Sequence, residues 1–200
     1  MARINDFFHA LDGLWKPVGR EPIPLEIIGS AAIMLQCDGY DRGTKDSDVL
    51  ESRESRPEVD LQLRELAGDR EKPLFKQNRF FIDIVQRGIP FLPTAPVFNA
   101  VPGLTLKNFV VTALHPADIA VSKLKLYRPE DSDDIRALAD RGLLEHGLLV
   151  KRFLLAAERF SVDARAEDVP GYLKNLRKVE RDILAVEPAA LDLPPQCEPD

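Results

Sequence analysis

The chain has 200 residues, 44% of them hydrophobic, which suits one domain or one domain with a helical appendage. Its net charge of −6 argues against a protein that coats nucleic acid through non-specific electrostatic contacts. No apolar run approaches the roughly 20 residues of a membrane span, and the N-terminus has no signal-peptide pattern. The two cysteines make no disulfide framework. A reduced, cytoplasmic protein without a membrane segment is therefore expected.

The first half of the chain alternates helices and strands. Apolar spacings of three and four predict a helix over residues 4–14, and short apolar runs bounded by Gly, Pro and polar residues predict strands. The Pro-Gly pair at 102–103 indicates a hairpin between the last two strands. The further predicted elements are helices over 30–36 and 58–67, and strands over 25–28, 46–50, 80–85, 98–101 and 104–114.

The second half is helical. Pro116 and Pro129 stand at first helical turns, where proline is favoured. The predicted helices cover residues 117–127, 130–140, 147–160 and 170–185. We therefore expect an α+β fold with three parts. They are a core of mixed β-sheet flanked by helices over 1–114, a helical part packed on it over 115–187, and a flexible Pro-rich tail over 188–200.

Three carboxylates on predicted strands are candidates for a metal site. Asp46 and Asp48 are one residue apart, so on a strand their side chains point the same way. Asp83 lies within the apolar run of residues 80–85, which we interpret as a buried strand. A charge buried there is costly unless it is paired or holds a metal. Such a set suits Mg²⁺ or Mn²⁺, because hard cations prefer oxygen ligands.

The strand over 25–28 ends at Gly29-Ser30, where a helix begins. Backbone amides at a helix start bind phosphate well. Two metal ions held by three carboxylates can clamp the phosphates of a nucleotide and activate a hydroxyl. The third carboxylate can take the proton of that hydroxyl. Together these residues indicate a nucleotide and metal site.

The order Gly29-Ser30, Arg42, Thr44, Asp46-Ser47-Asp48 and, much later, Asp83 resembles the nucleotidyltransferase superfamily of the DNA polymerase β type. Residues 118–138 are similar to one branch of it, the minimal bacterial nucleotidyltransferases. That branch includes toxin components of abortive-infection systems and the DUF6036-like group. The resemblance covers about residues 25–139.

The resemblance implies a role for each matching residue. Asp46, Asp48 and Asp83 would be catalytic and hold Mg²⁺ or Mn²⁺, and Lys123 would meet a phosphate of the nucleoside triphosphate. Asp131 or Asp134 would orient Lys123 or contact the nucleotide or the acceptor. The remaining nucleotide-binding residues would be Gly29, Ser30 and Thr44. One departure is that fifteen residues separate Ser30 from Asp46, slightly more than is usual in the superfamily.

The sequence is also compatible with other interpretations of these residues and of the function. Asp46 and Asp48 could be a solvated strand end, and the acids after Pro129 suit a helix N-terminus whatever their function. Four cations on the last helix could touch an RNA backbone, although a solvated face is favoured: Lys174, Arg177, Lys178 and Arg181. The acceptor hydroxyl could belong to RNA, a protein or a small molecule. A non-catalytic nucleotide- or partner-binding module, a cognate antitoxin and a homodimer are the further alternatives.

Overall fold

The computed structural model describes residues 4–43, 46–52, 56–161 and 168–193. These residues form eight helices and a mixed five-stranded sheet, which confirms the predicted α+β class. The chain divides into two compact units, residues 1–87 with 98–114 and residues 88–97 with 115–200. Within the described ranges, no helix has the length and apolar character needed to cross a membrane.

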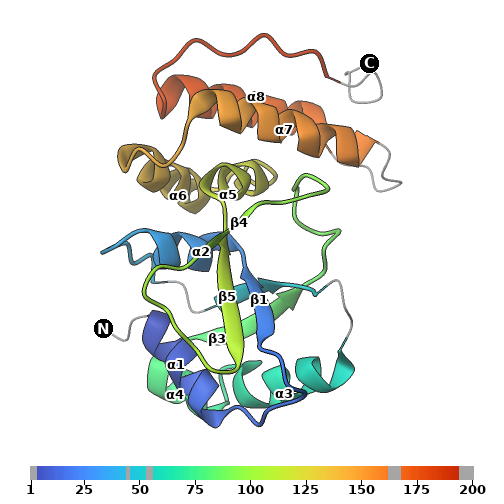
Figure 1. Ribbon diagram of the computed structural model, residues 1–200. Helices are drawn as coiled ribbons and strands as arrows, with labels where there is room; N and C mark the ends of the chain where they lie inside the picture. The colour runs from blue at the N-terminus through green and yellow to red at the C-terminus, as the bar shows by residue number, and fades with distance from the viewer. Residues whose placement is uncertain (1–3, 44–45, 53–55, 162–167, 194–200) are drawn as a thin grey trace. The chain divides into compact units, whose positions relative to one another are not determined.

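The first unit is built on the sheet, whose strand order is β3-β2-β1-β5-β4. β1 and β5 run parallel at its centre, as Figure 1 shows, and β2 runs parallel to β3. The pairs β1–β2 and β4–β5 are antiparallel. The strands are β1 (Ile23–Ile27), β2 (Asp46–Leu50), β3 (Phe81–Val85), β4 (Phe98–Ala100) and β5 (Phe109–Leu114).

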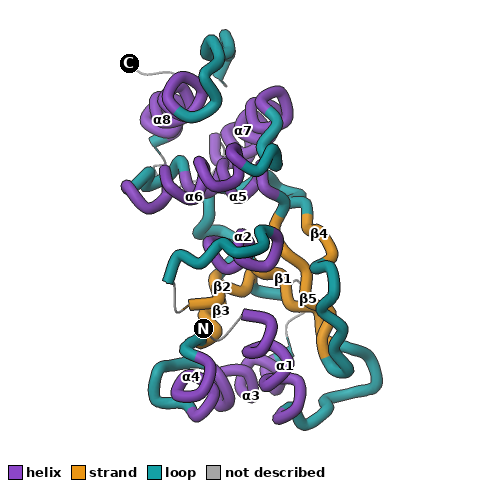
Figure 2. The backbone as a smooth tube through the Cα atoms, turned by 90° about the vertical axis from the view of Figure 1, so that its left-hand side faces the viewer, coloured by secondary structure: helices purple, strands orange, loops and turns teal. Residues whose placement is uncertain are grey.

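Four helices cover this sheet: α1 (Ile4–Leu14), α2 (Gly29–Gln36), α3 (Pro57–Ala67) and α4 (Pro73–Asn78). Figure 2 shows α2 on one side of the strands and the other three helices on the opposite side. The core contains ring contacts between Phe7 and Phe80, with centroids 6.0 Å apart, and between Trp15 and Phe109, 4.9 Å apart. Alternate residues of β1 are buried, as its alternating sequence requires.

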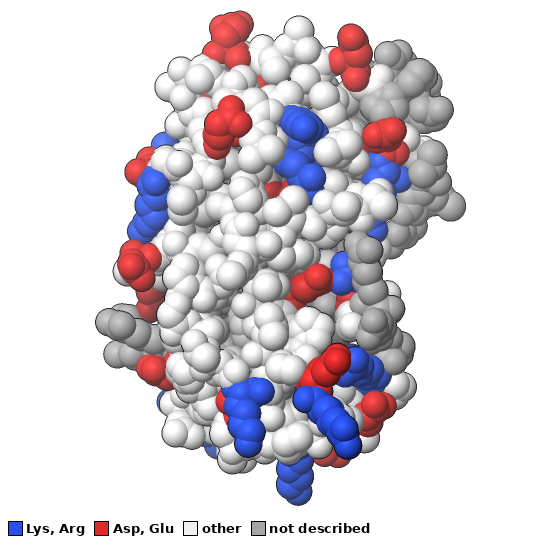
Figure 3. Space-filling model, viewed as in Figure 1, with Lys and Arg blue, Asp and Glu red and all other residues white. Residues whose placement is uncertain are grey.

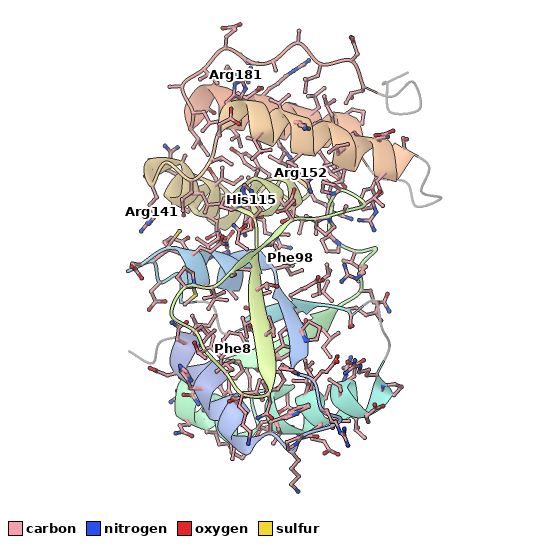
Figure 4. The ribbon with its side chains drawn as sticks, in the orientation of Figure 1. Phe8, Phe98, His115, Arg141, Arg152 and Arg181 are labelled. Carbon is pink, nitrogen blue, oxygen red and sulfur yellow. The ribbon has the colours of Figure 1, made fainter. Side chains whose placement is uncertain are left out.

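The second unit is helical: α5 (Pro116–Lys123), α6 (Pro129–Asp140), α7 (His146–Ser161) and α8 (Val169–Asp182). Figure 4 shows Arg152 reaching from α7 toward α5. Its guanidinium donates to both oxygens of the fully buried Asp118, at 2.6 and 2.8 Å. The backbone N–H of Val97 donates to the same carboxylate at 2.8 Å. The Asp118 carboxylate therefore holds the segment 88–97 against α5 and α7 through these hydrogen bonds.

Some predicted boundaries were wrong. The predicted strand from residue 104 begins only at Phe109, because the amides of Lys107 and Asn108 donate to the Asp12 carboxylate instead of to a strand. The helix predicted to reach Tyr127 ends at Lys123. The short helix α4 had not been predicted. At the start of the predicted tail, the backbone N–H of Ala189 donates to the carboxylate of Glu180 on α8 at 3.0 Å.

Candidate functional site

The carboxylates of β2 and β3 share one face of the sheet. In the parallel register of these strands, Asp48 lies opposite Asp83 and Asp46 lies opposite Phe81. Paired residues of neighbouring strands point to the same side, and so do residues two apart on one strand. Asp46, Asp48 and Asp83 therefore point to one side. The structure brings the backbone positions of the three candidates together.

Gly29 packs directly against Asp48. It has a φ of +64°, a left-handed conformation that side chains other than that of glycine rarely adopt. A Cβ at this position would lie 2.8 Å from Oδ2 of Asp48. The neighbouring N–H of Ile28 donates to the carbonyl oxygen of Asp48 at 2.8 Å. The start of α2 is thus fixed against one of the candidate carboxylates, which places Asp48 on the α2 side of the sheet.

Ser30, the second residue of α2, is buried, and its hydroxyl accepts a hydrogen bond from the guanidinium of Arg42. The helix has no side-chain cap at Ile28. Because α2 ends at Gln36, the extra length between Ser30 and Asp46 lies in the loop, and Arg42 of that loop returns to the helix start. The sequence indicated Arg42 only as part of the motif. Thr44 lies outside the described residues.

The prediction that Asp83 occupies a buried strand was wrong. β3 is an edge strand, and the Asp83 side chain is exposed while its neighbour Ile82 is buried. The aromatic and β-branched residues of this run had suggested burial on both faces, but an edge strand in a helix-backed sheet buries only one. Asp83 therefore has no large desolvation cost that a metal must offset. Its candidacy rests on its register with Asp48.

The donor atoms suit a hard cation, but they do not form a closed cage. Among the described residues, no three His, Cys, Asp or Glu side chains converge closely enough to hold a metal by themselves. Mg²⁺ commonly takes one or two carboxylates and completes its shell with water and substrate phosphates. The half-buried Asp46 and Asp48 together with Asp83 fit that mode of binding.

Three other predicted residues form a cluster within the helical unit: Lys123, Asp131 and Asp134. Lys123, only 8% exposed, lies 3.1 Å from Oδ1 of Asp131 and 2.5 Å from Oδ2 of the fully buried Asp134. Asp131 also accepts the backbone N–H of Arg128 at 3.0 Å, at the start of α6. Lys123 is therefore paired with both aspartates, whereas the resemblance implied that Asp131 or Asp134 would orient it. In this arrangement its ammonium group is neutralised by two carboxylates and ties α5 to α6.

The basic residues of α8 lie on its exposed side. Three of them are exposed and Lys178, partly covered, stands over the ring of Tyr127 at 5.8 Å. None of the four forms an ion pair with the part of the chain that the structure describes: Lys174, Arg177, Lys178 and Arg181. On the face seen in Figure 3, basic and acidic side chains are interspersed rather than gathered into one field.

Comparison with known proteins agrees with the arrangement of the first unit. No curated protein and no solved structure matches the chain significantly. The family model described as a nucleotidyltransferase of unknown function, DUF6036, matches residues 18–169. That range includes α2, the three strand carboxylates and the Lys123 cluster. Since the match covers more than half of its length, the chain belongs to the DUF6036 nucleotidyltransferase family.

Proposed function

We propose that the protein is a Mg²⁺-dependent nucleotidyltransferase that moves a nucleoside monophosphate from a nucleoside triphosphate to a hydroxyl group. The observation that carries this proposal is the register of β2 and β3, which aligns Asp48 with Asp83 and leaves Asp46 on the same face. The glycine-led start of α2 against Asp48 supports it, because the first turn of a helix suits the phosphates.

Each residue has a role in this reaction. Gly29 and Ser30 would bind phosphate oxygens, and Arg42, already on the Ser30 hydroxyl, adds a positive charge there. Asp46, Asp48 and Asp83 would hold the divalent ions. When bound, those ions supply charge stabilisation to the phosphates and lower the pKa of the attacking hydroxyl.

The transfer is a single displacement at the α-phosphorus of the nucleoside triphosphate. The acceptor oxygen bonds to the α-phosphorus, while the bond from that phosphorus to the oxygen bridging to the β-phosphate breaks. Pyrophosphate leaves with the electron pair of the broken bond. The proton of the acceptor hydroxyl passes to a carboxylate, and the exposed Asp83 is accessible for that purpose.

Thermal unfolding with nucleotide tests this proposal. Each triphosphate, added with Mg²⁺, should raise the melting temperature, since a ligand at a hundredfold excess over its Kd stabilises a protein by about 2.7 kcal/mol. The double variant Asp46→Asn/Asp48→Asn should abolish the shift and the release of pyrophosphate. The matched control is Asp133→Asn/Asp140→Asn, which changes two exposed aspartates of α6 and should keep both. A melting temperature unmoved by any of the four triphosphates would contradict the proposal.

A second candidate function is a nucleotide- or partner-binding module without turnover. It is favoured by the exposure of Asp83 and by the lack of a closed metal cage among the described side chains. This module would bind a triphosphate but release no pyrophosphate with any hydroxyl acceptor. Measuring Kd and pyrophosphate release on the same sample separates the two functions. For either one, a cognate protein partner remains a prediction from the resemblance to abortive-infection toxins.

A further inference from the structure

A second recess of the first unit lies beyond the carboxylate site. It is a cavity of about 300 Å³ where β2 ends, with walls from β1, β2, the first turn of α3 and Arg87, two residues after β3. Its lining includes Glu26, Leu50, Arg56, Asp60 and Arg87. A volume of this order accommodates a small molecule. Sequence patterns gave no signal for it, because its walls come from three stretches of the chain that meet only in the folded protein: 21–26, 50–60 and residue 87.

Two lining residues of the cavity, Glu26 and Leu50, belong to the sheet face that carries the candidate carboxylates. Leu50 follows Asp48 by two residues on β2, a distance of about 7 Å along the strand with the same side-chain direction. Leu50 is paired with Val85 of β3, two residues beyond Asp83. The antiparallel pairing of Ile27 with Val49 sets Glu26 beside Leu50. The wall of the cavity that Leu50 forms therefore lies about 7 Å along the strand from Asp48.

The charges of the cavity favour a cation. Arg87 is paired with Glu26, so these two charges largely offset each other. The Asp60 backbone N–H donates to the carbonyl oxygen of Arg56 at 3.1 Å, but its carboxylate forms no hydrogen bond or ion pair with the described residues. Its pKa is raised by burial, against the opposing effect of Arg64 and with a further increase from Glu51 and Glu58. Among the described residues that line the cavity, Glu21, Glu26 and Asp60 are acidic and Arg56 and Arg87 are basic, so the negative charges exceed the positive charges by one.

From this position and this charge, we propose that the cavity binds the acceptor of the transfer reaction, a small hydroxyl compound with a protonated amine that pairs with Asp60. That the bound compound is the acceptor rests on the proposed function, whereas the binding of an amine in the cavity does not. An ammonium group in the cavity would pair with the Asp60 carboxylate and offset the cost of its partial burial. A polyphosphate acceptor such as RNA would meet repulsion from the same carboxylates.

Binding of three matched sugars to the full-length protein at pH 7 tests the proposal without nucleotide or metal. The probes are 6-amino-6-deoxyglucose, glucose and glucose 6-phosphate, which differ at one position and carry a positive, no and a negative charge. By isothermal titration calorimetry, the amino sugar should bind about tenfold more tightly than glucose, and the phosphate should bind more weakly than either. Equal affinities, no binding of the amino sugar, or a preference for the phosphate would overturn the proposal.

Two variants with the same charge change locate the effect. Asp60→Asn should reduce the affinity for the amino sugar to that for glucose, whereas the exposed Asp133→Asn should leave it unchanged. Asp60→Asn is expected to fold, because the amide removes a partly buried charge, and near-UV circular dichroism checks this. Retained amino-sugar binding in folded Asp60→Asn would also overturn the proposal.

Failure of the acceptor pocket can be distinguished from failure of the proposed transfer reaction. Asp60→Asn should keep the thermal shift with nucleotide and Mg²⁺, since Asp60 is not among the residues placed at the phosphates. A normal nucleotide shift without preference for the amino sugar refutes the acceptor pocket alone. The preference without any nucleotide shift refutes the transfer reaction and leaves an amine-binding cavity.

Discussion

At the scale of single residues, Gly29 is constrained twice. Its φ of +64° disfavours any other residue, and the space where a Cβ would stand is taken by Oδ2 of Asp48, 2.8 Å away. Gly103 has a similar φ of +74°, but a Cβ there would meet nothing within 4 Å. The two glycines therefore separate the cost of the backbone conformation from the cost of displacing Asp48.

Gly29→Ala should lower the free energy of unfolding by more than Gly103→Ala. The left-handed conformation costs about 1–2 kcal/mol for alanine at either position, and only Gly29→Ala also pushes against Asp48. Urea unfolding of both variants measures the difference. Gly29→Ala should in addition weaken nucleotide binding in the presence of Mg²⁺, while Gly103→Ala should not. Equal effects of the two substitutions on both quantities would show that the contact with Asp48 is unimportant.

At the scale of secondary structure, the join between α5 and α6 depends on Lys123. Its ammonium lies among the carboxylates of Asp131 and Asp134, and Asp134 has no solvent exposure. Such a buried ion pair adds little stability compared with an apolar replacement of both partners, but losing one partner leaves an uncompensated charge. The structure therefore supports a structural role for Lys123 in addition to the phosphate contact implied by the family resemblance.

Lys123→Met should destabilise the protein by about 3–5 kcal/mol, because Asp134 would remain buried without its cation. The double variant Lys123→Met/Asp134→Leu should recover most of that loss, and urea unfolding of both variants measures it. Nucleotide binding then distinguishes the roles. If the stable double variant keeps the thermal shift with nucleotide and Mg²⁺, Lys123 is structural only. If the shift disappears while the fold is retained, Lys123 also contacts the phosphates.

At the scale of the whole molecule, the net charge of −6 disfavours the binding of nucleic acid, although α8 has a basic face. The four cations of that face stand on one side of a helix whose own Glu180 is fully buried, so nothing on α8 outside its last residue, Asp182, offers them a carboxylate. Such a face can attract phosphates at low salt. On the face seen in Figure 3, basic and acidic side chains alternate, and that face provides no extended basic track for a nucleic acid.

We expect short single-stranded RNA to bind only at low ionic strength. Four phosphate contacts give a slope of about −3 in log K against log salt, so binding measured by fluorescence anisotropy should vanish near physiological salt. Replacing Lys174, Arg177, Lys178 and Arg181 with Gln should remove even the low-salt binding. The control with the same change in charge replaces four exposed cations of the first unit: Lys16, Arg20, Lys76 and Lys107. Submicromolar binding near physiological salt that depends on α8 would instead identify RNA as a partner.

The local elements could be predicted because they depend on neighbouring residues. The periodicity of residues 4–14 and the order of Gly29-Ser30 and Asp46-Ser47-Asp48 were sufficient to predict α1, the start of α2 and the strand β2. The exposure of Asp83 could not be predicted, because it depends on β3 being at the edge of the sheet. The start of β5 was also missed, since Asp12, nearly a hundred residues earlier in the chain, accepts the amides of Lys107 and Asn108.

The sequence by itself determined the fold class, most of the elements and the family, because periodicity and motif spacing are properties of short segments. Only the tertiary structure decided which candidates meet. The register of two strands aligns Asp48 with Asp83, and the turn into α2 brings Gly29 against Asp48. It also formed the cavity beside Asp60 from three separate stretches of the chain. Strand register and cavity shape arise from long-range packing, which no local pattern encodes.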